Sequence, residues 1–99
     1  MVNPSETREG AEEIAVAALG FVAADPALLG RFLSITGIEP EAIRLAAREP
    51  GFLAGVLQFI IAHEPTLIAF AQTAGIDPAS VAEAMRNLPQ GDDRYEAST

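Results

Sequence analysis

The sequence GFLAGVLQFIIAHE, at positions 51–64, decides the fold of this protein. Its large apolar side chains leave almost no polar face: Phe52, Leu53, Val56, Leu57, Phe59, Ile60 and Ile61. A helix that is apolar nearly all round is buried, either at the centre of a bundle or in a membrane. A stretch of about 13 residues is too short for a bilayer, which needs roughly 20. We therefore expect a compact soluble bundle around a buried central helix at about 50–63.

The composition favours one helical domain. The chain has 99 residues, of which 49% are hydrophobic, which is enough for a single core. Helix-favouring residues dominate and strand-favouring residues are few, so we predict an all-α fold of about six short helices. The absence of cysteine excludes a disulfide scaffold and a thiolate metal site. No pattern of a secretory signal begins the chain, so we expect a cytoplasmic protein.

The charge of the protein restricts its partners. The formal net charge is −8, and all six basic residues are arginines that do not cluster. Such a protein is repelled by phosphate backbones and by anionic lipid. We therefore expect no nucleic-acid partner and no membrane partner, and DNA binding by a pair of helices is the least favoured function.

Steps from an acidic residue to proline divide the chain into helices. Proline disfavours helical geometry in the residue before it and fits the first turn of the next helix. A glycine suits the left-handed position that ends a helix. The residues that we expect at structural turns and caps are Asp25, Pro26, Gly37, Pro40, Pro65, Gly75, Asp77 and Pro78.

These boundaries give the predicted organisation. Positions 1–9 form a flexible lead-in, positions 10–89 form one domain, and positions 90–99 form a flexible acidic tail. The predicted helices lie at about 8–24, 26–36, 40–48, 50–63, 64–74 and 78–88.

The two halves of the domain follow the same plan. The segment that begins at Gly37 (GIEP) corresponds to the one that begins at Gly75 (GIDP), and the offset is 75 − 37 = 38 residues. Phe21 corresponds to Phe59 and Ile43 to Val81 at the same offset. We interpret this as two three-helix units, at about 11–49 and 50–89, related by a pseudo-twofold axis. A chance similarity from an Ala- and Pro-rich composition is the alternative.

The chain also resembles a known family. The run AEEIAVAALGFVAADPALLGRFLSITGIEP, continued through the second Gly-Ile turn, is similar to short alphaproteobacterial helical proteins of the uncharacterised family DUF3572. The resemblance extends from Ala11 to Pro89. It implies an all-helical bacterial protein, cytoplasmic, and brings no established activity or site residue with it.

His63 is the only histidine, and it stands beside Glu64 between the two halves. It could act as a general base or as a pH-sensitive contact. We favour a structural role in the last turn of the central helix, where a histidine binds unpaired carbonyls. No cysteine, serine motif or second histidine offers it a catalytic partner.

Other polar groups are better explained by structure than by chemistry. The acidic residues before the prolines lie at separate helix starts, whereas a metal site needs several converging oxygens, so we expect no metal and no cofactor. Arg44 and Arg48 could bind a phosphate or a carboxylate together, but a favourable charge at a helix end is the simpler account. Asp92, Asp93 and Tyr95 could form a docking peptide, but we favour a solvated C-terminus.

The functional prediction is a small, non-enzymatic, acidic protein-interaction module, an adaptor or regulator. It would bind a protein partner, or a copy of itself, through an apolar helix face, because the apolar supply is generous and no catalytic constellation is present. The alternative is a small-ligand or catalytic pocket between the two halves near His63. The candidate interaction residues are Phe32, Phe70, His63 and Glu64, and apolar surface left by Leu45 or Leu88 could add to them.

Overall fold

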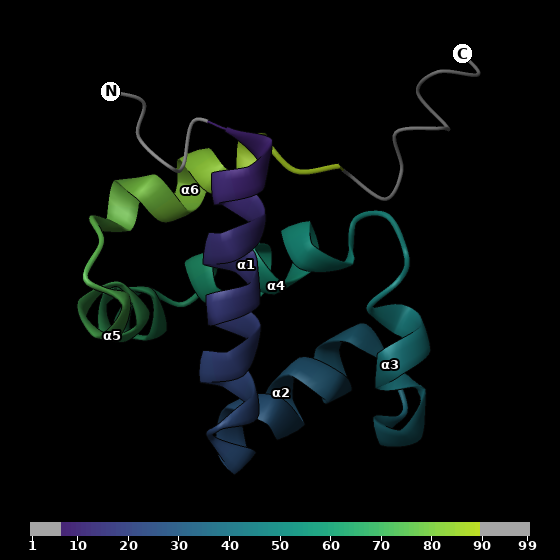
Figure 1. Cartoon of the computed structure of the whole chain (residues 1–99). Helices are drawn as coiled ribbons and strands as arrows, with labels where there is room; N and C mark the ends of the chain where they lie inside the picture. Colours follow the sequence, from purple (N-terminus) through teal and green to yellow (C-terminus); the bar gives the residue numbers. More distant parts are fainter. Residues whose placement is uncertain (1–6, 90–99) are drawn as a thin grey trace.

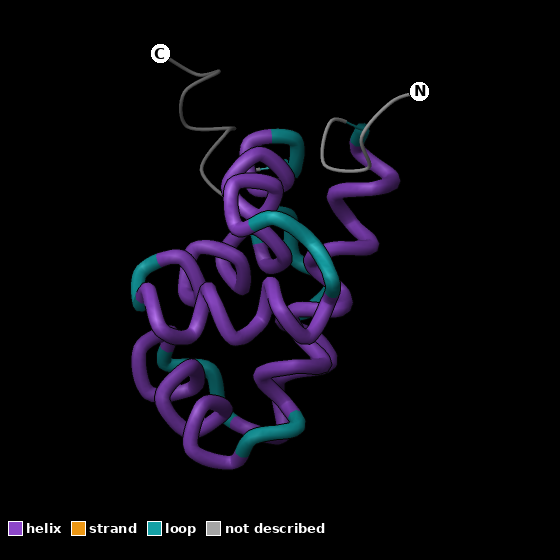
Figure 2. The backbone as a smooth tube through the Cα atoms, turned by 90° about the vertical axis from the view of Figure 1, so that its left-hand side faces the viewer, coloured by secondary structure: helices purple, strands orange, loops and turns teal. Residues whose placement is uncertain are grey.

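The computed structural model describes residues 7–89, and this part of the chain consists of helices and connecting loops without strands (Figures 1 and 2). The predicted all-α fold is confirmed. The elements are α1 (Arg8–Ala23), α2 (Pro26–Thr36), the 3-10 helix η2 (Pro40–Ala42), α3 (Ile43–Ala46), α4 (Phe52–Ile61), α5 (Glu64–Ala74) and α6 (Pro78–Arg86).

Helix α4 is the buried central helix that the sequence predicts. It packs against α1, α5 and α6, and α1 crosses it at the centre of the molecule (Figure 1). The side chains of Val56, Leu57 and Ile60 are completely buried. Burying one such side chain contributes about 1.5–3 kcal/mol, so α4 contributes strongly to the stability of the fold.

Helix α1 packs against α4 and α6, and its buried face consists of small side chains. Ala11, Ala15, Ala18 and Val22 have no exposed surface and recur every three or four residues along α1. This spacing places them on one face of the helix. Because the distance between two packed helices depends on the side chains at the contact, a face of alanines allows a close crossing.

Aromatic contacts join the outer helices to this centre. The ring of Phe32 on α2 lies 5.4 Å from the ring of Phe59 and 6.0 Å from that of Phe52, both on α4 and both edge to face. The ring of Phe21 on α1 lies 5.5 Å from the ring of Phe70 on α5. Tilted and edge-to-face rings attract each other beyond simple burial. These pairs hold α2 and α5 against the two central helices.

Asp25 and Asp77 cap their helices, but Glu39, which precedes Pro40, does not. Asp25 accepts hydrogen bonds from the backbone N–H groups of Ala27 (2.9 Å) and Leu28 (3.4 Å). Asp77 accepts one from Ala79 at 2.9 Å. Glu39 makes no capping hydrogen bond with its side chain. Thr7, which the sequence analysis did not single out, caps α1 by accepting from the N–H of Gly10 at 3.0 Å.

The third predicted helix is much shorter than expected. In place of one helix over 40–48, the chain forms η2 and then the single turn α3. Glu39 supplies no side-chain cap, and α3 packs chiefly against η2, so neither capping nor burial extends the helix. Leu45 is consequently 68% exposed.

Three glycines take the left-handed conformation. Gly37 (φ 75°) and Gly75 (φ 71°) end α2 and α5 as predicted. Gly51 (φ 91°) is a third, and the sequence analysis had placed it inside the central helix. Because Gly51 is the N-cap of α4, this helix begins at Phe52 and is somewhat shorter than predicted.

The two halves are alike in their first two helices and differ in the third. The pairs α1–α2 and α4–α5 bend by 110° and 112° at their breaks. Helix α6 packs on both α1 and α4, whereas α3 stays at the edge of the core. A shared bend does not establish a common origin, so the duplication stays a prediction.

No helix among residues 7–89 is by itself long and apolar enough to cross a bilayer. The two bent pairs reach the necessary length and composition only when both of their helices are counted together.

The predicted lead-in and acidic tail fall largely on positions 1–6 and 90–99, which lie outside the described residues. The docking peptide around Tyr95 lies there too. Helix α1 begins at Arg8, slightly before the predicted start of the domain.

Replacing Leu57 with alanine should lower the free energy of unfolding by roughly 2–5 kcal/mol, because the side chain is completely buried and leaves a cavity. Urea denaturation followed by circular dichroism measures this change. The control is Val16→Ala on the exposed side of α1, which should change stability by no more than about 0.5 kcal/mol. An equal loss of unfolding free energy in Leu57→Ala and Val16→Ala would show that α4 is not the centre of the core.

Two glycine-to-alanine substitutions should change stability in opposite directions. A side-chain carbon added at either Gly37 or Gly30 meets no atom within 4 Å, so only the backbone decides the outcome. Gly37→Ala should destabilise by about 1–2 kcal/mol, since its φ is positive. Gly30→Ala, within α2, should stabilise by about 0.5–1 kcal/mol. The melting temperature is measured for both variants. A shift in the same direction for Gly37→Ala and Gly30→Ala would contradict a left-handed conformation at Gly37.

Candidate functional site

His63 lies at the start of α5, not in the last turn of the central helix. It is the N-cap residue of α5, and its backbone N–H donates to the carbonyl oxygen of Ile60 at 3.2 Å. Its Nδ1 atom lies 2.7 Å from Oγ1 of Thr66, one turn into α5. The predicted interaction of its ring with the last carbonyls of α4 is therefore wrong, because the ring turns toward the next helix.

Thr66, the residue that His63 contacts, is part of the folded core. Thr66 is the one buried residue with a polar side chain in the part of the chain that the structure describes. A buried hydroxyl without a hydrogen bond is costly, and His63 supplies that bond from the exposed side. Glu64 is exposed at the first position of α5, where a negative charge is favourable. Among residues 7–89, no group of three or more His, Cys, Asp or Glu side chains could hold a metal ion.

The two candidate phenylalanines do not lie on the surface. Phe32 and Phe70 are each 1% exposed, and their rings make the aromatic contacts with α4 and α1 described above. The expectation that they present an apolar face to a partner is thus corrected: the core is large enough to contain both rings. Leu88 is buried as well, so Leu45 is the one of these apolar residues that is left exposed.

An apolar groove lies between α2 and α4. This α2–α4 groove has a volume of about 350 Å³ and is lined by Ile35, Thr36, Gly55, Gln58, Phe59 and Ala62. None of these side chains is charged. Ile35 is 69% exposed at its edge, and a side-chain carbon placed on Gly55 would meet no atom within 4 Å. The central helix is therefore uncovered along this strip.

A second hollow lies on the other side of the molecule's central pair of helices. This α1–α5–α6 pocket has a volume of about 240 Å³. Ile14 and Phe70, both buried, line it together with the half-buried Ile76. Its polar lining consists of the carboxylate of Glu13 and the hydroxyl of Ser80.

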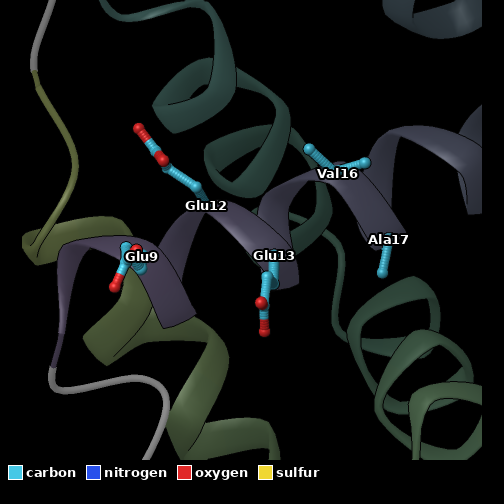
Figure 3. A pocket seen from close by; sticks show the side chains of 5 residues that line it. All are labelled: Glu9, Glu12, Glu13, Val16 and Ala17. Atoms are coloured by element: carbon cyan, nitrogen blue, oxygen red, sulfur yellow. The ribbon is translucent and has the colours of Figure 1, made fainter.

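The exposed side of α1 next to this pocket is acidic. A shallow hollow of about 540 Å³ runs along α1 over Glu9, Glu12, Glu13, Val16 and Ala17 (Figure 3). Glu9, Glu13 and Ala17 point to one side of the helix, and Glu12 and Val16 point to the other. Glu12 forms an exposed ion pair with Arg8 at 3.8 Å. The carboxylates thus diverge and do not form a common chelating group.

The signals for these surfaces in the sequence are weak. Ile35 follows Phe32 by three positions and Leu28 by seven, so helical spacing places it beside the apolar stripe of α2 and does not mark it as exposed. Val16, 58% exposed, lies off the buried stripe of α1, and its position in the pattern does indicate exposure. Arg44 and Arg48 are exposed near the end of α3, as expected for charges at a helix end.

These features define a small all-helical protein whose described residues form two apolar hollows, the α2–α4 groove and the α1–α5–α6 pocket. The family model DUF3572, a protein of unknown function, matches residues 8–91, and the chain belongs to this family. No curated protein and no solved structure matches the chain.

The contact between His63 and Thr66 can be measured by a double-mutant cycle. His63→Ala should lower the free energy of unfolding by about 1 kcal/mol, because it removes a hydrogen bond to a buried hydroxyl. In a Thr66→Val background, the same change should cost almost nothing. Equal costs of His63→Ala in both backgrounds, measured by urea denaturation, would show that the two residues are not coupled.

Proposed function

We propose that this protein is a non-enzymatic interaction module that binds an amphipathic helix of another protein in the α2–α4 groove. The observation that carries this proposal is the uncovered strip of α4 at Gly55, Gln58 and Ala62. These residues are spaced by three and four positions, so they lie on one side of the central helix. On its other sides, α4 is buried against α1, α5 and α6.

The groove has the chemistry of a site for an apolar helix face. Ile35 and Phe59 offer apolar contact, and Gly55 lets a partner's backbone or side chain approach α4 closely. Helices that dock in grooves insert apolar side chains at positions i, i+3, i+4 and i+7. The absence of charge from the lining means that such side chains enter without removing water from an ion.

The net charge favours a different protein over a second copy as the occupant. Two copies would each bring a charge of −8 to the interface, and like charges oppose association. A helix with an apolar face and a neutral or basic outer face meets no such repulsion. The cytoplasm stays the proposed location.

The alternative function, a ligand or catalytic pocket near His63, has no observation in its favour. His63 lines neither the α2–α4 groove nor the α1–α5–α6 pocket. Its ring nitrogen is instead engaged by Thr66.

Filling the groove should abolish binding without unfolding the protein. Gly55→Leu places a side chain in open space within a helix, so the protein should remain folded and its stability should not fall. Proteins retained from native cell extract by the wild-type domain are identified by mass spectrometry. The affinity of the purified partner is then measured by calorimetry for each variant. We expect Gly55→Leu to weaken it at least tenfold.

The matched control is Gly20→Leu on α1, where an added Cβ atom also meets no atom within 4 Å. This variant should bind as the wild type does. If both variants bind the partner equally well, or if only self-association is found by light scattering, the proposal is wrong.

A further inference from the structure

The α1–α5–α6 pocket is small, apolar inside and acidic at its edge. Ile14, Phe70 and Ile76 supply the apolar lining, and Glu13 supplies a carboxylate. Its volume of about 240 Å³ lies below the roughly 300–1,000 Å³ that is usual for drug-sized ligands. A volume of this size suits one apolar side chain of a partner.

The acidic edge continues along α1. Glu9 precedes Glu13 by four residues and points to the same side of the helix (Figure 3). Both side chains are exposed, and within residues 7–89 neither forms an ion pair. The nearby basic residue Arg8 is engaged with Glu12, which points to the other side. A ligand in the pocket would therefore meet Glu13, and one that also extends along α1 would meet Glu9, and neither carboxylate is engaged in an ion pair within residues 7–89.

We propose that this pocket is a second docking site, separate from the α2–α4 groove, for a basic segment of another protein. One apolar side chain of that segment enters the pocket beside Ala17, Ala74 and Ile76, whose surfaces are open to a partner, whereas Ile14 and Phe70 lie buried behind them. Lysine or arginine residues beside it pair with Glu13 and Glu9. Burial of the apolar anchor provides most of the affinity, and the two ion pairs provide selectivity and faster association.

Charge complementarity selects this occupant over the two others that the chain could supply. A second copy carries the same net charge of −8 as the first. Positions 90–99 contain Asp92, Asp93 and Glu96 against Arg94, a net charge of 1 − 3 = −2. Both would be repelled by the glutamates of α1, whereas a basic segment would be attracted.

The test uses the full chain and two synthetic helical peptides that share the same leucine positions. One peptide carries lysine at its polar positions and the other carries glutamate. Binding is followed by backbone amide chemical shifts and by calorimetry. The Leu/Lys peptide should bind and shift the amides of Glu13, Ala17, Ala74 and Ile76, and the Leu/Glu peptide should not bind. Raising the salt concentration should weaken the complex, since exposed ion pairs are screened.

Two variants with the same change of charge separate a site from general attraction. The double substitution Glu9→Gln and Glu13→Gln should lower the affinity for the Leu/Lys peptide about fivefold. Glu39→Gln with Glu41→Gln removes two exposed carboxylates on and beside η2 and should leave the affinity within about twofold, because long-range attraction to the whole protein is largely screened. Ala74→Leu, which narrows the pocket at an exposed position, should weaken binding about tenfold with the net charge unchanged.

Several outcomes would overturn the proposal. Equal weakening by the two glutamine pairs would mean that only the overall charge attracts the peptide. Amide shifts confined to the α2–α4 groove would mean that this pocket is not used. A dimer of the wild-type protein that Ala74→Leu dissociates would assign the pocket to a second copy, and binding that is lost on removal of the tail would assign it to positions 90–99.

Discussion

The crossing of α1 over α4 is the contact on which the rest of the structure depends. The four small residues of α1 that have no exposed surface, Ala11, Ala15, Ala18 and Val22, lie on one face of this helix, which packs against α4 and α6. Protein interiors are packed so densely that a change of one methylene group affects them, so this contact fixes the position of α1 relative to α4. Helix α6 packs on both of them, and the rings of Phe32 and Phe70 hold α2 and α5 at the sides.

The same crossing determines which surfaces remain open. Helix α6 covers α1 and α4 on one side, but α3 is too short and too far toward the edge to cover α4 on the other. A strip of the central helix around Gly55 is therefore left exposed and forms the α2–α4 groove. On α1, the face opposite the alanines carries the glutamates beside the second pocket. Both hollows thus follow from how the core is packed, and neither needs a dedicated loop.

The candidate site was harder to predict than the fold. The sequence offered four apolar residues for an exposed patch, and of these Leu45 is exposed whereas Phe32, Phe70 and Leu88 are buried. Apolar residues of similar size look alike until their neighbours are known. His63 lies at a helix boundary, as predicted, but at the start of α5 and not in the last turn of α4. The difference is one of backbone conformation: His63 is extended (φ −129°, ψ 104°), and its ring reaches Thr66 in the next helix.

The sequence alone determined the helical class, the position of the central helix and most of the places where helices begin and end. These features depend on local physics: the apolar character of residues 52–61, the capping of Asp25 and Asp77, and the backbone freedom of Gly37 and Gly75. Only the tertiary structure decided how far the third helix extends, which aromatic rings are inside and where α4 stays uncovered. Each of these depends on contacts between segments distant in the sequence, and no local preference records whether a distant segment covers a given face.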